Sequence, residues 1–541
     1  LFVWPNKDSF GYKPISISLL SGIARQRGWE TALFDTTGFD LGYADNVESG
    51  ESASLFKPVD LSVFGIGKVK TDLGAEFRKA LEESSPDLLA FSVLSDEYQI
   101  AASLSATAKK WQADLPIIWG NKYPTLNPGP TLLEHQADYA CLAEGLDVFG
   151  DFLEAMESGR DLKTIPNIWA KSKRGEIIEN PIRPLRKELD DLPYVDWTIF
   201  DRRQFIKPFD GQAYVSGDHM LNWGCPYSCT YCINAFTQKI YEGKYFMRRY
   251  GVPRIIAELK HLKKTYDLAF FKFHDEDFLM RPVENFRQLS AAYREAVNLP
   301  FTIETNPKSV TEEKARLLKE MNCASVTLAI ETGDQKMRRQ LLKRVDTKED
   351  IIRAFGLLKE LGIRTSSFNM LAIPFESRQT FQATIQVNRK AQVQYPNAGF
   401  FYPFEGTRLR EIAIEEGFFD PNRAETAVYR RDVPALRFKD VSQDDLIAWR
   451  NVFVLYVKLP EVFAPFIRRS EALDELGRRL RSKLLEIFHR TVWKNDGWYV
   501  DDGRQEEYMR ELRAIAGDDP LVAREESAET RPDQGGQHAR I

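Results

Sequence analysis

Three cysteines lie within eight residues of this 541-residue chain, in the segment GCPYSCTYC. Cys225, Cys229 and Cys232 are separated by three and then two residues. Thiolates are the usual ligands of iron–sulfur clusters, and closely spaced cysteines on one loop can reach three irons of a single cube. The fourth iron would then have no protein thiolate and would be free to chelate a substrate or cofactor. The spacing therefore predicts a [4Fe–4S] cluster with one open iron.

Two other readings of the cysteines are weighed against a cluster. Gly224 and Pro226 flank the first cysteine and indicate a loop, which disfavours three ordinary core cysteines. A structural zinc site would take four ligands, and His219 or His274 could complete the set. Zinc knuckles usually pair two close ligand doublets, and the sequence has no second doublet. The alternative to an iron–sulfur enzyme is therefore a non-enzymatic binding protein that zinc stabilises, which would be colourless.

Composition limits the kinds of partner. Hydrophobic residues make up 43% of the chain and charged residues 28%, which is typical of globular domains, and the length suggests two to four of them. The net charge of -5 comes without a long basic run, so we expect no nucleic-acid partner. The sequence contains no run of eighteen or more apolar residues, so we expect no membrane span. We also expect a cytoplasmic protein. Because LFVWP at the start resembles a strand already under way, we expect a trimmed N-terminus.

The first 157 residues alternate short apolar runs with helical patterns, which predicts a doubly wound parallel sheet. Such sheets bind ligands at the carboxyl ends of their strands, here the loops 5–13, 92–97 and 120–127. The expected strands are 1–4, 31–35, 88–93 and 117–119, and the expected helices are 14–26, 99–110 and 148–156.

The rest of the chain divides into four parts. Residues 158–213 are rich in proline and are expected to connect two domains, with a hairpin over 167–179 that turns at Gly175. Residues 214–417 return to strand–helix alternation and predict a partial (β/α)6 barrel with function at its carboxyl end. Residues 418–516 are expected to be helical, and the polar tail 517–541 to be disordered. The barrel strands are expected at 214–223, 269–274, 301–305, 325–330, 366–371 and 398–402.

The cysteine motif, with aromatic Tyr231 before its third cysteine, resembles that of the radical S-adenosylmethionine superfamily. The resemblance continues over residues 80–417. HDEDF at 274–278 is similar to the acidic cluster that ends the second strand, and IETG at 330–333 to the end of the fourth. AIPFES (372–377) and YPFEGT (402–407) resemble the later Pro-Gly turns, with Phe375 in place of glycine and Glu405 in place of proline.

The resemblance implies an activity. The reduced cluster would pass one electron to S-adenosylmethionine, which would give methionine and a 5′-deoxyadenosyl radical. An external one-electron reductant and a small-molecule or natural-product substrate are the implied partners. Arg249 is as good a candidate as Arg248 for the contact to the methionine carboxylate of S-adenosylmethionine. Asp275 and Asp277 can cap the next helix instead of contacting a ligand. The S-adenosylmethionine contacts implied by the resemblance are Tyr231, Arg248, Glu304, Glu331 and Asn369.

A doubly wound domain ahead of the barrel resembles the cobalamin-binding domain of one subgroup of this superfamily. GNKYPTLNP (120–128) is similar to its cofactor loop, and LAEGLDVFGDFLEAM (142–156) to the segment that follows. Ser95, Tyr123 and Thr125 are the implied neighbours of cobalamin. His135 is the only histidine before residue 219 and no DxHxxG pattern occurs, so the cofactor would be bound base-off.

The subgroup implies methylation of an unactivated carbon through methylcobalamin. Ring formation or another rearrangement is the alternative. A methylthiotransferase would need three more cysteines near the N-terminus, where Cys141 stands alone. Both Cys141 and Cys323 lie in or beside apolar runs and are expected in the core.

Overall fold

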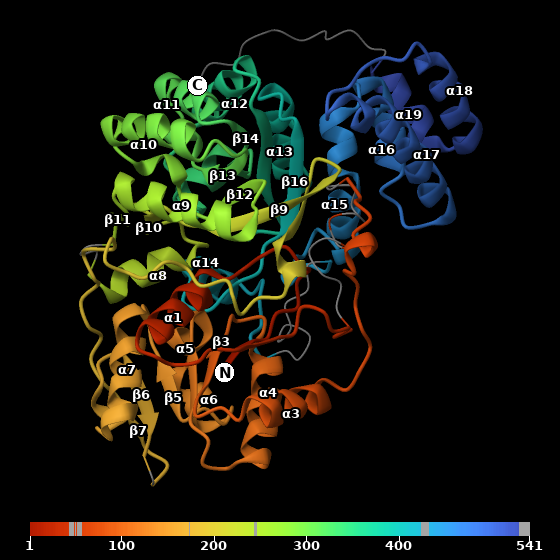
Figure 1. Ribbon diagram of the computed structural model, residues 1–541. Coiled ribbons are helices and arrows are strands. Elements are labelled where there is room, and N and C mark those ends of the chain that lie inside the picture. The colour runs from red at the N-terminus through yellow and green to blue at the C-terminus, as the bar shows by residue number, and fades with distance from the viewer. Residues whose placement is uncertain are drawn as a thin grey trace.

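The computed structural model describes residues 1–42, 48, 50, 57–172, 174–242, 246–422 and 432–529. The described residues form an N-terminal α/β domain, a half-barrel and a group of C-terminal helices (Figure 1). Within them, no helix is long and apolar enough to cross a lipid bilayer.

The N-terminal sheet has the strand order β2-β1-β3-β4-β5-β6-β7 in the described part of the chain, and its first five strands are parallel. This arrangement confirms the predicted doubly wound fold, with strand order reversing between β1 and β3. The strands are β1 (Phe2–Trp4), β2 (Leu33–Asp35), β3 (Leu89–Ser92), β4 (Ile117–Gly120), β5 (Tyr139–Cys141), β6 (Ile168–Lys171) and β7 (Ile177–Ile178).

Side chains of these strands alternate between two helical layers. Phe2, Ala90 and Ile118 belong to one buried cluster, which includes residues of α1 (Ile15–Gln26) and α7 (Leu146–Ser158). Val3 and Trp119 belong to another cluster, shared with α3 (Leu73–Ser84) and α4 (Tyr98–Trp111). Burial on both faces explains why the strands are continuous apolar runs. A short helix, α5 (Lys122–Leu126), forms within the segment 120–127 that the sequence predicted as a loop, and α6 (Pro128–Leu133) follows it.

The predicted hairpin forms, but it is not a free connector. Gly175 has φ +83° and donates its N–H to Ser172 O over 3.0 Å, which makes the expected turn. Its arms, β6 and β7, continue the N-terminal sheet, because β6 pairs antiparallel with β5. The sheet therefore extends past the expected boundary at residue 157. These strands are short and flanked by prolines, so their apolar pattern is not long enough to assign them to a sheet from the sequence.

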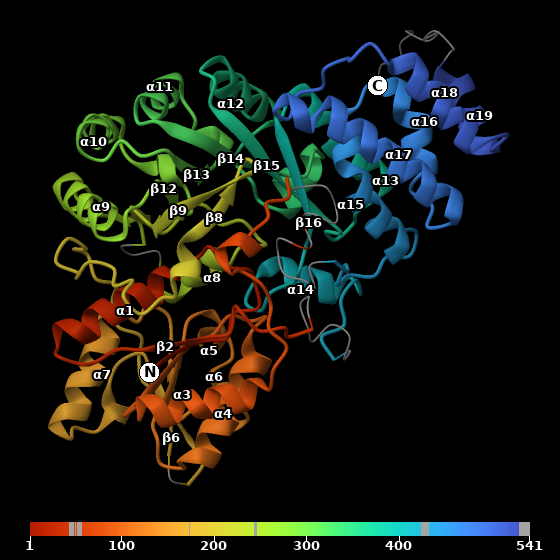
Figure 2. The same cartoon turned by 45° about the vertical axis from the view of Figure 1, so that its right-hand side comes forward.

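The second sheet is a half-barrel of order β16-β15-β14-β13-β12-β9-β8 among the described residues (Figure 2). Six of its strands run parallel, as predicted, and β8 adds an antiparallel edge. The strands are β8 (Ile206–Phe209), β9 (Gln212–His219), β12 (Phe270–Phe273), β13 (Phe301–Thr305), β14 (Cys323–Glu331), β15 (Arg364–Leu371) and β16 (Tyr395–Phe400).

Helices cover the outer face of the half-barrel. Their starts are fixed locally: Thr347 with Asp350, and Ser377 with Thr380, form capping boxes. Along each strand, successive side chains point alternately to the inner and the outer face of the half-barrel. The covering helices are α9 (Val252–Tyr266), α10 (Val283–Ala296), α11 (Glu312–Glu320), α12 (Lys348–Glu360) and α13 (Arg378–Lys390). Two further helices, α8 (Ile233–Ile240) and α14 (Arg408–Glu415), lie on the side of the half-barrel that faces the N-terminal domain (Figures 1 and 2).

The C-terminal helices lie beside β16 (Figure 2). Trp449 and Phe453 of α15 (Gln443–Lys458) are buried against α13 and β16, so they pack the barrel edge. The remaining helices are α16 (Ala464–Arg469), α17 (Glu475–Thr491), α18 (Gln505–Ala516) and α19 (Pro520–Glu529).

One expectation about the C-terminus is wrong. Residues 520–529 of the tail predicted as disordered form α19, and Val522 is buried in the C-terminal core. Asp519 also pairs with Arg469 at 2.7 Å. Among the described contacts of this segment are one buried apolar side chain and one ion pair, which is too weak a pattern to recognise in a polar sequence. Residues 530–541 lie outside the described residues.

Candidate active site

The cysteine loop joins β10 (Asn222–Trp223) to α8, the short helix that begins after Cys232. Gly224 has φ +85°, and a Cβ there would lie 2.0 Å from Phe246 O, so only glycine fits this turn. Cys232 N–H donates to Cys229 O over 3.1 Å. The side-chain amide of Gln238 on α8 donates to the carbonyls of Cys225 and Tyr227. The loop is thus held by its own backbone and by the helix behind it.

All three motif cysteines are free thiols. Burial raises the pKa of Cys225 to about 12 and that of Cys232 to about 11, and it also raises the pKa of Cys229. Each thiol is close enough to another for their charges to interact. In the part of the chain that the structure describes, no three or more His, Cys, Asp or Glu side chains are grouped to hold a single metal ion. One loop thus carries three free thiols, which is the number of donors that a cluster with an open iron requires.

Tyr231 connects this loop to the end of β14. Its hydroxyl donates to Glu331 Oε1 over 2.9 Å and accepts from Arg344 Nη1, also over 2.9 Å. Arg344 is buried, lies 3.7 Å from Glu331 Oε1 and donates to Asp346 over 2.9 Å. Burial raises the pKa of Glu331, while Arg344 and Tyr231 act in the opposite direction. Two predicted site residues, Tyr231 and Glu331, are therefore brought together at the carboxyl end of a barrel strand.

Glu331 adopts φ +65°, in the left-handed region that non-glycine residues rarely occupy. A buried residue in such a conformation costs roughly 1–3 kcal/mol and persists where the surroundings impose it. Here β14 and β15 shift register between Ala329 and Glu331, which turns the carboxylate toward Tyr231.

Glu304 is placed on the inner face of the half-barrel. It forms a 2.6 Å ion pair with Lys272 of the neighbouring strand. Although burial alone would raise the pKa of Glu304, the charge of Lys272 lowers it below the ordinary value. The side chain remains 40% exposed, so a ligand in the barrel can reach it.

His274 lies beside this pair and is fixed by Asp218. The imidazole Nε2 lies 2.8 Å from Asp218 Oδ1, and the Asp218 side chain is fully buried. Burial would raise the pKa of Asp218, but Lys13, Lys207 and His274 hold it well below the usual range. Because Asp218 stays ionised, His274 places its proton on Nε2 and presents Nδ1 as an acceptor.

Asn369 is buried in β15 and its amide is used within the protein. Its Nδ2 donates to Ser367 Oγ over 2.9 Å and to Asn397 O over 2.8 Å. Its Oδ1 accepts from Asn388 Nδ2 over 2.7 Å. These bonds hold the Asn369 amide between β15, β16 and α13. Asn369 is also the register partner of Glu331 across β14 and β15, so the two predicted site residues lie on neighbouring strand ends.

Arg248 faces the N-terminal domain. It lies on β11 (Arg248–Arg249), and its guanidinium forms a bidentate ion pair with Glu144 at 3.0 and 2.6 Å. This pair joins the loop after β5 to the barrel. The neighbouring Arg249 is exposed.

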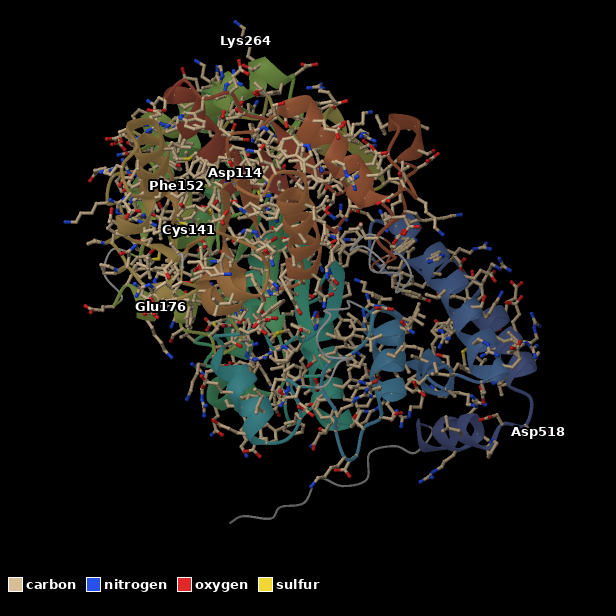
Figure 3. All side chains as sticks on the ribbon, turned by 90° about the horizontal axis from the view of Figure 1, so that it is seen from below. Asp114, Cys141, Phe152, Glu176, Lys264 and Asp518 are labelled. Carbon is tan, nitrogen blue, oxygen red and sulfur yellow. The ribbon has the colours of Figure 1, made fainter. Side chains whose placement is uncertain are left out.

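A cavity lies where these two domains meet. Its walls are the carboxyl ends of β3, β4 and β5 on one side and β10, β11 and α8 on the other. Figure 1 shows α8 between the barrel strands and the N-terminal sheet. Cys141, labelled in Figure 3, is buried and borders the cavity from β5. The open end of the doubly wound sheet thus faces the helix that follows the cysteine loop.

Of the three residues predicted beside cobalamin, Thr125 borders this cavity. Its Oγ1 accepts from Ala143 N over 2.9 Å. Tyr123 is instead stacked on Tyr98, with ring centres 4.7 Å apart, and its hydroxyl oxygen lies 2.9 Å from His135 Nε2. From the β3 end it is Ser92, not Ser95, that borders the cavity.

Several residues of the site were not predicted. Asp218 had a usable signal, since an acid inside an apolar strand is rarely buried without a partner. Arg344 and Lys13 had none, because each acquires its role from a partner more than a hundred residues away. Trp223 and Glu276 also border the cavity, and only the folded structure reveals that position.

Residues 223–387 match the model of the radical SAM superfamily. An uncharacterized methyltransferase of Pyrococcus horikoshii is 24% identical over 341 residues, which cover 63% of this chain and 72% of that protein. The cytidylyl-2-hydroxyethylphosphonate methyltransferase of Streptomyces wedmorensis is 23% identical over 456 residues, 77% of this chain and 80% of that one.

Among solved structures, the fold resembles that of the radical S-adenosylmethionine methyltransferase TsrM from Kitasatospora setae, determined with cobalamin and a [4Fe–4S] cluster. The TM-score is 0.60 at 15% identity, and the match covers 95% of this chain and 99% of TsrM. With its cysteine loop at the end of a parallel half-barrel, the matched part of the chain is a radical SAM domain.

Proposed function

We propose that this radical SAM enzyme binds cobalamin between its two α/β domains and methylates a carbon of a small molecule or natural product. The observation that carries the proposal is the position of the cavity. It lies at the carboxyl edge of the N-terminal sheet, where doubly wound sheets bind ligands, and it borders α8, which begins directly after Cys232. A cofactor held there lies beside the cluster loop.

The relatives support the same assignment. The two relatives named above carry the name methyltransferase, and the similar TsrM structure holds cobalamin and a cluster. The apolar lining, with Phe2, Ile17 and Phe149 among its residues, suits a large macrocycle with an apolar body.

The chain's own residues divide the work. Cys225, Cys229 and Cys232 hold three irons, and Tyr231 with Glu331 fixes the loop against β14. When bound, the cluster and S-adenosylmethionine supply radical chemistry, and cobalamin supplies the methyl group. An external one-electron donor is needed to reduce the cluster.

Substrate recognition falls to the inner face of the half-barrel. Lys272 and Glu304 offer one charge of each sign there, and His274 offers an acceptor nitrogen. These groups favour a substrate with polar or ionic substituents.

The test is anaerobic reconstitution with iron, sulfide and hydroxocobalamin, followed by S-adenosylmethionine carrying a deuterated methyl group and a reductant. We expect stoichiometric iron and sulfide, release of 5′-deoxyadenosine, and transfer of the labelled methyl to the bound cobalamin. Stoichiometric zinc without sulfide would overturn the radical chemistry. Release of 5′-deoxyadenosine without labelled cobalamin would instead favour a cyclase or rearrangement enzyme.

A further inference from the structure

Two buried N–H groups at the cavity have no hydrogen-bond acceptor among the described residues. They are Trp223 Nε1 and Arg248 Nε, and both residues border the cavity. Trp223 and Arg248 face each other as register partners of the two-stranded β10–β11 ribbon. Other buried side-chain atoms among the described residues also lack a partner, but these two belong to register partners that border one cavity. Their shared position indicates a ligand that brings acceptors.

The rest of the Arg248 guanidinium is already used. Nη1 donates to Glu144 Oε1 over 3.0 Å and to Arg186 O over 2.8 Å, while Nη2 donates to Glu144 Oε2 over 2.6 Å. The guanidinium also lies 5.6 Å from the Trp223 ring centre. Its side chain is only 7% exposed. Arg248 is therefore fixed in place, and Nε is its one nitrogen without an acceptor among the described residues.

Glu144 is held as firmly as Arg248. Its backbone N–H donates to the Tyr241 hydroxyl over 2.9 Å, and Tyr241 itself borders the cavity. The ion pair thus closes the cavity across the two domains. A ligand seated there meets the strand ends of the N-terminal sheet on one side and the ribbon on the other.

We propose that Trp223 Nε1 and Arg248 Nε donate hydrogen bonds to peripheral carboxamide oxygens of the bound cobalamin. The inference rests on the proposed function and assigns Arg248 to the cobalamin site in place of the S-adenosylmethionine contact predicted from sequence. Cobalamin fits the observations because it surrounds an apolar macrocycle with carboxamide groups. The ribbon forms the barrel-side wall of the site.

The arrangement has a consequence for the two cofactors. Trp223 is followed by Gly224 and Cys225, so the cobalamin wall runs directly into the cluster loop. Because Trp223 and Cys225 are only two positions apart, a hydrogen bond from Trp223 to cobalamin would fix the position of cobalamin relative to the cluster.

The experiment measures hydroxocobalamin affinity of the reconstituted full chain by equilibrium dialysis with absorbance detection. Trp223→Phe removes one donor and keeps an aromatic ring. Arg248→Lys removes Nε–H and keeps a cation for Glu144. Trp223→Phe is expected to weaken cobalamin binding about fivefold to tenfold, as for one lost hydrogen bond. Arg248→Lys is expected to weaken it at least as much, because it also breaks the bidentate pair with Glu144. Iron content and S-adenosylmethionine affinity should be unchanged in both variants. Circular dichroism checks that each variant is folded.

Matched controls come from the same chain. Arg249→Lys alters the exposed neighbour on β11, and Trp169→Phe removes an indole N–H that is bonded to Asn180 O, away from the cavity. Both should bind cobalamin like the wild type. If Trp223→Phe and Arg248→Lys also bind it like the wild type, the inference is wrong while the proposed function stands. If Arg248→Lys loses S-adenosylmethionine and keeps cobalamin, Arg248 belongs to the other site. If the wild type binds no cobalamin, both proposals fail.

Discussion

The hydroxyl of Tyr231 donates to Glu331 and accepts from Arg344, each over 2.9 Å. One phenol thereby joins the cluster loop to the strand end that carries the acidic residue. Both partners are buried, so the hydroxyl fixes their positions without competition from water.

Tyr231→Phe should therefore weaken S-adenosylmethionine binding while the cluster remains. The three thiolates are untouched, so iron per chain should not change. The variant loses the hydrogen bonds to both Glu331 and Arg344. If the resulting misplacement of Glu331 costs ligand binding about 1–2 kcal/mol, the affinity should be roughly fivefold to thirtyfold weaker. The measurement is equilibrium binding of S-adenosylmethionine to the reconstituted protein. Tyr227→Phe is the control, because Tyr227 lies on the same loop and bonds to Ser309 instead. Unchanged affinity in Tyr231→Phe would show that the phenol plays no part in orienting Glu331.

Replacing any one motif cysteine should abolish the cluster. Cys225→Ala, Cys229→Ala and Cys232→Ala each remove one of three available thiolates from the loop, and an iron–sulfur cube held by two is unstable. We expect loss of iron, of sulfide and of visible absorbance after anaerobic reconstitution. Cys323→Ala is the matched control, since Cys323 is buried at the start of β14 and bonds weakly to Ser325 O over 3.6 Å. Full iron content in any of the three motif variants would contradict the assignment.

The two α/β domains are joined by a fully buried ion pair between Lys13 and Asp218. The pair is 2.8 Å long, and neither side chain is exposed. Lys13 Nζ also donates to Gln204 O and Ser216 O over 3.1 and 3.0 Å. Lys13→Met leaves the Asp218 carboxylate buried without its main partner. The expected loss is about 3–5 kcal/mol in free energy of unfolding, measured in urea.

The control for Lys13→Met is a surface pair. Lys79 and Glu83 lie 3.8 Å apart, and their side chains are 67% and 68% exposed. Lys79→Met should change the free energy of unfolding by less than about 0.5 kcal/mol. A comparable effect in the two variants would mean that Lys207 and His274 alone satisfy Asp218.

The cysteine loop could be predicted from sequence because its chemistry is contained in a few consecutive residues. The buried strands could be predicted because sheets covered on both faces need continuous apolar runs. Arg248 shows where such reasoning stops: its closeness to the cysteines in sequence says nothing about which domain its side chain faces. Its partner Glu144 lies more than a hundred residues away. Tyr123 shows the same limit, since a loop resemblance could not reveal that its ring stacks on Tyr98.

Glu376 gives the folded protein a specific dependence on pH. Its carboxyl group is buried at the turn after β15, and burial raises its pKa from 4.5 to about 7. The Thr380 hydroxyl and backbone N–H groups act in the opposite direction. Between pH 4.5 and pH 7 the folded state holds a proton that the unfolded chain has lost, so stability falls as the pH rises through this window. The loss amounts to about 3 kcal/mol, and above the folded-state pKa it stays constant.

Glu376→Gln removes this titration and keeps the shape of the side chain. We therefore expect its free energy of unfolding to gain about 2–3 kcal/mol relative to the wild type between pH 5 and pH 8. Urea unfolding at half-unit pH steps, without S-adenosylmethionine, gives the two curves. Glu349→Gln is the control, since Glu349 is exposed on α12 and its curve should run parallel to the wild type. Parallel curves for Glu376→Gln as well would mean that the turn after β15 holds Glu376 ionised throughout this range.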